Sequence, residues 1–237
     1  MESQAQVVRG TGATPRLVAL VLVVGCLSLA LASCDRPTAV EVGTRPASGY
    51  QIEGRILDRL GVPMEGIEVY PYYDLVYASS DTAPAREYEV KDSVTMVTVR
   101  VLSSEDSVVR ELASGFYQPG FLLVVWDRKD SAGSDVPSGA YRVCYIVGGQ
   151  IVASYGVLVE GTLTARTDAT GTFTLSNRHL PLGFAPVPLY SRDSSVFYGT
   201  YSVGSAVFLE LTTPTTIHTV GVRPSKDRVT AVSLVLE

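Results

Sequence analysis

The chain has few cysteines and histidines and no cluster of basic residues. Among its 237 residues are 3 cysteines and 2 histidines, and its formal net charge is −5. A nucleic-acid interface needs clustered lysine and arginine to neutralise phosphates, and no segment of this sequence has such a cluster. The two histidines, His179 and His218, stand alone and lack the paired spacing of a zinc site. We therefore expect no nucleic-acid partner, no metal and no cofactor.

Long apolar runs and enzyme motifs are scarce as well. After the N-terminal region, no apolar run approaches the ~20 residues that a membrane-spanning helix needs. The sequence has no nucleophile elbow of the Gly-x-Ser-x-Gly kind, no phosphate-binding loop and no dinucleotide-binding fingerprint. A carboxylate pair of the glycosidase kind is not visible in a sequence, because its members meet only in the fold. We therefore expect a protein without catalytic activity and keep an unrecognised hydrolase as an alternative.

The N-terminal region has the pattern of a secretory signal peptide. Arg9 and Arg16 precede the apolar segment Leu17 to Ser33, which is followed by Cys34. This apolar segment is shorter than a spanning helix, which disfavours an uncleaved anchor. We predict a signal peptide over residues 1–33.

The end of this segment, Leu31-Ala32-Ser33-Cys34, resembles a bacterial lipobox, in which small residues before a cysteine allow cleavage and diacylation of its sulfur. The resemblance implies that lipidated Cys34 attaches the mature protein to a membrane. It places the chain in the bacterial cell envelope, facing the periplasm or the cell exterior. Each buried methylene contributes about 0.8 kcal/mol, so more than one acyl chain gives stable attachment. The alternatives are an uncleaved anchor and cleavage after Ala30-Leu31-Ala32 by the ordinary signal peptidase.

The remaining cysteine is predicted to be free. Cys26 lies in the predicted signal peptide and Cys34 is the lipid site, which leaves Cys144 in the apolar segment YRVCYIV. A buried, unpaired cysteine behaves as a small hydrophobic side chain, and this is our interpretation of Cys144. A disulfide between Cys34 and Cys144 is the alternative if Cys34 is not lipidated.

The mature chain has the alternation typical of β-strands. Residues 34–48 contain two prolines and no hydrophobic period, which predicts an extended tether. From Tyr50 onward, Ile52 and Ile56 alternate with polar residues, as in a half-buried strand. No amphipathic helix follows, and later runs are rich in valine, tyrosine and isoleucine. We therefore predict an all-β protein.

The segment Phe121 to Val147 combines two apolar runs with a turn-rich middle. Six apolar residues end at Trp126, the only tryptophan, and a second β-rich run begins at Ala140. Aspartate, glycine and proline dominate the stretch between them, which predicts a hairpin. In this hairpin the rings of Trp126 and Tyr141 would meet across the strand pair and anchor a sandwich core.

Two separated parts of the chain resemble one family. The segment Tyr50 to Val69 has an Asp-x-x-Gly turn at Asp58 to Gly61, then a proline and a glycine before the next strand. The signature Thr-Asp-x-x-Gly-x-Phe-x-Leu follows at Thr167 to Leu175, and an alternating strand over Val229 to Leu236 closes the pattern. These features resemble the carboxypeptidase regulatory-like family, and the resemblance implies a transthyretin-like β-sandwich.

The intervening segment resembles a different family. It has a Val-Arg-x-Leu segment at Val109 to Leu112, Trp-Asp at Trp126, and Gly-x-x-Val-Pro-x-Gly-x-Tyr from Gly133 to Tyr141. These features, within residues 93–145, are similar to the Ig-like domain of the flagellar hook-assembly protein FlgD. Arg128 departs from that family, which usually has glycine after Trp-Asp, and this difference bears on the local turn.

The two resemblances predict two β-sandwich domains, with the Ig-like sandwich inserted into the transthyretin-like one. Structureless loops longer than about 15 residues are uncommon in compact domains, so the long interval is interpreted as a domain. Two sequential domains that divide near Glu160 are the alternative. The predicted division is a signal peptide at 1–33, a tether at 34–48, the transthyretin-like sandwich at 49–84 and 160–237, and the Ig-like sandwich at 85–159.

Two segments have side chains suited to binding. Tyr72, Tyr73 and Tyr77 lie in the tyrosine-rich segment YPYYDLVY, and exposed tyrosines stack on sugars or contact protein partners. The other interpretation is that they fill a strand face. Asp130 and Asp135 lie with Asp127 in one loop, and the three offer hard oxygen ligands for Ca²⁺, but their spacing fits no EF-hand and aspartate is also favoured in turns.

Together these patterns predict a lipid-anchored binding or adaptor protein of the cell envelope. Its predicted partners are the membrane, through lipidated Cys34, and an unknown protein or glycan, through the tyrosines and aspartates just named. A structural spacer within an envelope assembly is the first alternative, and an unrecognised hydrolase is the second.

Overall fold

The structure, a computed structural model, describes residues 40–79, 85–190 and 196–236. These residues are all-β, with strands packed as sandwiches and one short 3-10 turn, η1 (Asn177–His179), which confirms the predicted fold class. Within the described ranges, no helix has the length and apolar character needed to cross a membrane.

The first sandwich packs two sheets around one core. Sheet A has the strand order β1 (Val40–Pro46), β15 (Arg228–Val235), β2 (Tyr50–Leu57), β11 (Thr172–Leu175). Sheet B has the order β10 (Ala165–Arg166), β3 (Glu68–Ser79), β13 (Phe197–Thr212), β12 (Val187–Tyr190), and β14 (Ile217–Val222) also pairs with β13. Ile52 and Leu175 of sheet A contribute to the same buried cluster as Leu209 of sheet B.

The second sandwich has a separate core. Its smaller sheet pairs β4 (Glu87–Val90) with β7 (Gly120–Leu123). The facing sheet has the order β6 (Val108–Tyr117), β5 (Thr95–Ser103), β8 (Gly139–Val147), β9 (Gln150–Val159). Val99 and Val143 lie in this core with Trp126 and have almost no exposed surface, because alternate residues of each strand face inward.

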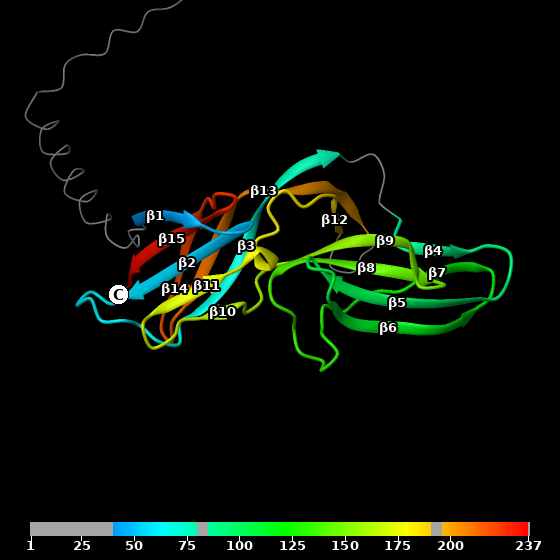
Figure 1. Ribbon diagram of the computed structural model, residues 1–237, viewed down its shortest axis with the longest axis horizontal. Helices are drawn as coiled ribbons and strands as arrows, with labels where there is room; N and C mark the ends of the chain where they lie inside the picture. The colour runs from blue at the N-terminus through cyan, green and yellow to red at the C-terminus, as the bar shows by residue number, and fades with distance from the viewer. Residues whose placement is uncertain (1–39, 80–84, 191–195, 237) are drawn as a thin grey trace, which may run out of the picture. The chain divides into compact units, whose positions relative to one another are not determined.

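The strand order nests one sandwich within the other along the chain. In the described part of the chain, β4 to β9 pair among themselves, whereas β2 and β3 pair with strands that follow β9. Figure 1 accordingly shows the blue and cyan strands beside yellow and red ones, and the green strands together. Whether each part folds independently at the predicted boundaries stays a prediction.

The hairpin predicted for Phe121 to Val147 is wrong. β7 pairs with β4, and β8 pairs with β5 and β9, so the two segments lie in different sheets. β7 ends at Leu123 because the backbone of Val124 is bound by side chains of the facing sheet. Its N–H donates to the Tyr145 hydroxyl (3.2 Å), and its C=O accepts from the Tyr155 hydroxyl (2.8 Å).

The predicted ring contact of the same segment is present. The ring centroids of Trp126 and Tyr141 lie 5.1 Å apart in an edge-to-face arrangement. Because their segments belong to different sheets, the rings meet inside the sandwich and not across a strand pair. The prediction that Trp126 is buried against Tyr141 is therefore confirmed.

β1 occupies much of the predicted tether. Val40–Pro46 pairs antiparallel with β15, so the prediction of a free tether is wrong over these residues. An open strand edge offers backbone groups that any extended segment can bind, whatever its side chains. Asp227 fixes the turn that follows, since its carboxylate accepts from the Gly49 N–H (3.0 Å) and its C=O from the Ala47 N–H (3.1 Å). Residues 34–39 lie outside the described residues.

Gly54 is a close-packing position in sheet A. It lies in β2 directly opposite Phe173 in β11, and a Cβ atom added to Gly54 would be 1.9 Å from Cε1 of that ring. Phe173 is itself buried in the first core, so the ring has little space into which it can move.

We expect Gly54→Ala to lower the free energy of unfolding by about 1–3 kcal/mol, because the added methyl group overpacks this contact. Urea denaturation measures the change. Gly115→Ala in β6 is the matched control: its added Cβ would be 4.0 Å from the nearest atom, so we expect a change of less than about 1 kcal/mol. Equal losses in the two variants would contradict the packing explanation.

Candidate binding site

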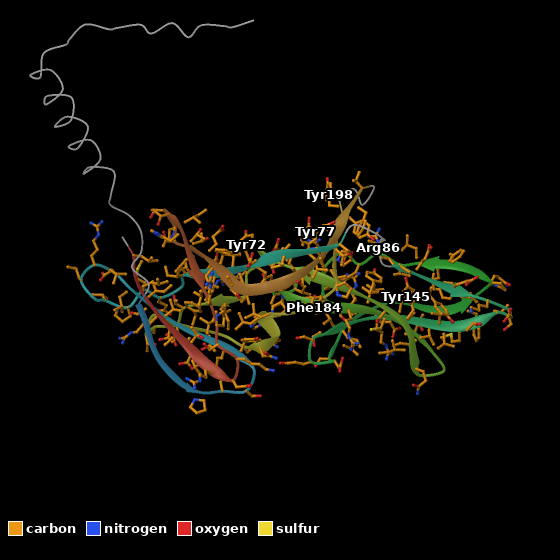
Figure 2. The ribbon with its side chains drawn as sticks, turned by 90° about the horizontal axis from the view of Figure 1, so that it is seen from above. Tyr72, Tyr77, Arg86, Tyr145, Phe184 and Tyr198 are labelled. Atoms are coloured by element: carbon orange, nitrogen blue, oxygen red, sulfur yellow. The ribbon has the colours of Figure 1, made fainter. Side chains whose placement is uncertain are left out.

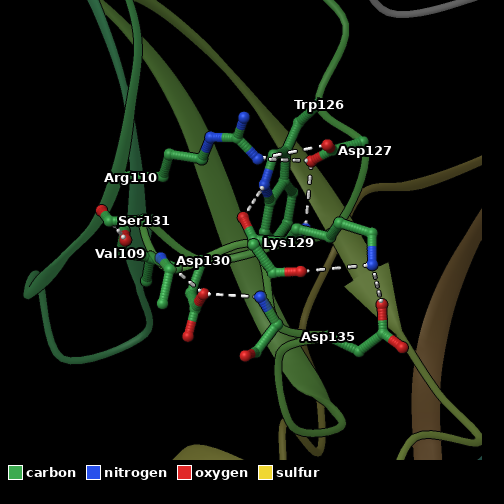
Figure 3. A network of polar contacts seen from close by, with 11 residues as sticks. Val109, Arg110, Trp126, Asp127, Lys129, Asp130, Ser131 and Asp135 are labelled. Atoms are coloured by element: carbon green, nitrogen blue, oxygen red, sulfur yellow. Dashed lines mark hydrogen bonds and ion pairs between the residues drawn. The ribbon is translucent and has the colours of Figure 1, made fainter.

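The acidic loop around Asp127 and Asp135 is held by two ion pairs, one with Arg110 of β6 and one within the loop (Figure 3). The Arg110 guanidinium donates to both carboxylate oxygens of Asp127, at 2.9 and 3.1 Å, and Lys129 Nζ donates to Asp135 at 3.0 Å. The indole N–H of Trp126 donates to the Lys129 C=O (2.8 Å), which ties this loop to the second core. In the part of the chain that the structure describes, no group of acidic, histidine or cysteine side chains is arranged to hold a metal ion.

Asp130 has the role of a turn residue. Its Oδ1 accepts from the N–H groups of Ala132 and Ser134, both at 2.9 Å. Asp58 and Asp168 make the same bonds to residues two and four positions later, and a glycine at positive φ stands three positions after each of the three aspartates. The repeated geometry favours the turn interpretation of Asp130. A binding role for Asp130 or Asp135 stays a prediction.

The three predicted tyrosines of β3 lie in different environments. Tyr73 is only 6% exposed, and its hydroxyl donates to the His179 C=O at 2.9 Å. Burial raises the pKa of this hydroxyl, which therefore stays neutral. The prediction of a surface binding role for Tyr73 is wrong, because alternate side chains of a strand face the core.

Tyr72 and Tyr77, labelled in Figure 2, remain on the surface. Tyr72 is 37% exposed and Tyr77 is 55% exposed. The ring of Tyr77 contacts Tyr201 edge to face, with centroids 5.5 Å apart. Both tyrosines are thus on the surface, and a binding role for them stays a prediction.

A cleft of about 440 Å³ is lined by residues of the two segments predicted to bind a partner, the tyrosine-rich strand and the acidic loop. Leu75 of the tyrosine-rich strand and the Asp127 end of the acidic loop line the same cavity. Its other walls come from β9 and β12, so residues of both sandwiches contribute. The lining residues are Leu75, Arg86, Val125, Trp126, Asp127, Arg128, Tyr155, Gly156, Val157, Leu158, Glu160, Val187, Pro188, Leu189 and Tyr190.

Charged groups of both signs line this cleft. The guanidinium carbon of Arg86 lies 3.9 Å from the centre of the Tyr190 ring, a cation–π contact that orients the arginine. Glu160 accepts a long hydrogen bond from the Tyr73 N–H (3.4 Å), and its side chain is otherwise exposed. Arg128 is exposed as well. A cavity with apolar walls and a few polar groups is suited to holding a ligand in one orientation.

Arg128 has a backbone conformation that favours glycine. Its φ is 63°, in the left-handed region that costs most residues about 1–2 kcal/mol. The turn after Trp126-Asp127 therefore keeps the geometry that a glycine would give, although this chain has arginine there. Such an outlier at a cavity is a reason to suspect a functional side chain.

Sequence patterns did not identify Arg86, Glu160 and Tyr190 as site residues. They come from three distant segments, and none of them belongs to a recognisable sequence motif. The sequence gives one signal for two of them, which is their position along the chain. Arg86 lies close to the predicted start of the inserted segment, and Glu160 lies close to its end. Residues near both ends of an insertion must lie close together in the fold.

Among the described residues, Cys144 and the two histidines do not line the cleft. Cys144 is free and buried, as predicted, and burial raises the pKa of its thiol, which leaves it a weak nucleophile. Burial, assisted by the Arg178 charge, lowers the pKa of His179 to about 4, so its imidazole is neutral at pH 7. The Arg178 Nε–H donates to Nε2 of this imidazole at 3.0 Å.

Comparison with known proteins adds no relative: no family model matches the chain, and no curated protein matches it. The two family resemblances stay expectations that depend on the residues given for them. Cys34 lies outside the described residues, so its lipidation stays a prediction too.

Proposed function

We propose that this chain is a lipid-anchored binding or adaptor protein of the bacterial cell envelope that acts without catalysis. Lipidated Cys34 attaches it to a membrane, and the cleft lined by Arg86, Arg128 and Glu160 holds a protein or glycan partner. The first sandwich is carboxypeptidase regulatory-like and the second is FlgD-like in this proposal. The cleft is the observation that supports it most, because segments of both sandwiches present cations, two carboxylates and aromatic rings in one cavity.

The side chains that could act as a nucleophile or a base already have structural roles, which favours binding over catalysis. Asp130 and Asp168 use their carboxylates to hold turns, and Asp127 is paired with Arg110. The Cys144 thiol is buried, and His179 is neutral and bonded to Arg178. Groups committed to structure in this way are poor candidates for a nucleophile or a general base.

Arg128→Gly tests the proposed use of the cleft. It removes the guanidinium and suits the positive φ, so stability should stay equal or rise by up to about 1–2 kcal/mol. Capture of a partner from detergent-solubilised envelopes should fall about tenfold if a charged hydrogen bond to the ligand is lost. Quantitative pull-down with the full chain measures the captured amount.

Lys91→Ser is the matched control, because Lys91 is an exposed cation of the second sandwich that does not line the cleft. It should leave capture unchanged. Equal capture by wild type and Arg128→Gly would remove the cleft from the proposal and favour a structural spacer. Turnover of a glycan, ester or peptide that depends on a single carboxylate or serine would refute the non-catalytic part.

A further inference from the structure

The outer face of sheet B presents two aromatic rings on neighbouring strands. Tyr72 in β3 is directly opposite Phe208 in β13, and Phe208 is opposite Gly221 in β14. Residues directly opposite in an antiparallel pair project from the same face. The flanking residues Val207 and Leu209 are fully buried, so this face points to solvent, where Tyr72 is 37% and Phe208 42% exposed.

A glycine lies against each ring. A Cβ atom on Gly161 would be 2.8 Å from three atoms of the Tyr72 side chain, and one on Gly221 would be 3.5 Å from Cε1 of Phe208. The Tyr72 ring therefore occupies space that a side chain at position 161 would fill, whereas a Cβ at position 221 would be in ordinary contact with the Phe208 ring. Because both side chains are partly exposed, part of each ring is open to a ligand.

Carboxylates accompany the rings. Glu160 accepts from the N–H of the adjacent Tyr73, and Glu210 is opposite Tyr70, two residues before Tyr72. Burial, and to a smaller extent the charges of Glu210 and Glu160, raise the pKa of the Tyr72 hydroxyl. Glu210 projects from the same face as Phe208, two residues further along β13, and has no ion pair with a described residue. This face thus joins two aromatic rings to two hydrogen-bond acceptors of negative charge.

We propose that this surface, the Tyr72–Phe208 platform, binds an uncharged glycan. The electropositive C–H face of a sugar packs on the negative face of an aromatic ring, and sugar hydroxyls donate to carboxylates. Glu160 and Glu210 repel acidic polysaccharides, and the net charge of −5 acts in the same direction. Polar side chains such as Thr219 alternate with the rings, which favours a hydroxyl-rich ligand over the apolar centre of a protein interface.

This inference rests on the proposed binding function and names the chemical class of one partner. The platform adjoins the cleft, since Glu160 both lines the cleft and acts on Tyr72. Arg128, in contrast, lines the cleft and is not part of the platform. Substitutions at the two places therefore separate the two proposals.

Calorimetric titration of the full chain with cellohexaose and chitohexaose tests the platform. At least one of these uncharged oligosaccharides should bind, and Tyr72→Ser and Phe208→Ser should each weaken binding about tenfold. Tyr72→Phe should keep most of the affinity, because it retains the ring. Phe116→Ser is the control: Phe116 is an exposed phenylalanine, 77% accessible, in β6 of the second sandwich, and its loss should not change binding.

Three results of the titrations would overturn the inference. They are no binding of either oligosaccharide, preferred binding of the acidic polymer polygalacturonate, and binding that the Tyr72 and Phe208 substitutions leave intact. Capture of a protein that depends on these two rings would also overturn it, in favour of a protein surface. If partner capture still depends on Arg128 in any of these cases, the proposed function stands without the platform; if it does not, both fail.

Discussion

Trp126→Ala is expected to lower the free energy of unfolding by about 3–5 kcal/mol, a large share of the 5–15 kcal/mol typical of folded proteins. Trp126 is 6% exposed, packs edge to face on Tyr141, and anchors the following turn through its bond to the Lys129 C=O. Truncation to alanine therefore leaves a cavity in the second core and also removes the donor that holds the turn.

Urea denaturation of Trp126→Ala and of Phe121→Ala measures this effect. Phe121 belongs to the same apolar segment but is exposed, so its truncation should change stability by no more than about 0.5 kcal/mol. The native fluorescence of the wild type supplies an independent check, since its emission comes largely from the single tryptophan. Emission at the wavelength of a solvent-exposed indole would contradict the burial of Trp126.

Cys34→Ala is expected to abolish incorporation of labelled palmitate and to release the chain from the membrane fraction. The reason is that the sulfur of Cys34 is the predicted attachment point, and the acyl chains provide about 0.8 kcal/mol of membrane affinity per methylene. Metabolic labelling followed by membrane fractionation measures both outcomes.

Cys144→Ala is the matched control for this experiment. Cys144 is a free, buried cysteine of β8, so its replacement should leave lipid labelling and membrane attachment intact. Absence of label from the wild type, or a mature N-terminus at Ser33 in intact-mass analysis, would show that Cys34 is not lipidated.

Local chemistry made much of the fold predictable. The alternation around Ile52 and Ile56 predicts β2, and both side chains are buried in the first core. The Asp-x-x-Gly pattern predicts turns at Asp58 and Asp168, because such an aspartate accepts the N–H groups of its own turn. These features arise from interactions between residues a few positions apart, so they can be predicted from one sequence.

Strand pairing and the site depend on distant residues, and here prediction failed. The sequence between Trp126 and Tyr141 looks like a hairpin, yet β7 finds its partner in β4, earlier in the chain. Tyr72 and Tyr73 have the same residue type and adjacent positions, and only the location of the core decides that Tyr73 is inside. The cleft residues Arg86 and Glu160 likewise meet through topology and not through any local pattern.

The nesting of the strands sets an order in which the chain can fold. A ribosome delivers the N-terminal part first, and β2 and β3 then have no partner until residues beyond Glu160 have been made, because β10, β11, β13 and β15 all follow β9. β4 to β9 have their ladders within one continuous segment and can form first, since short separations cost less loop-closure entropy. Nascent chains that stop before Arg228 lack β15, so β2 is then without its parallel neighbour, and its unpaired edge is open to aggregation or to chaperone binding.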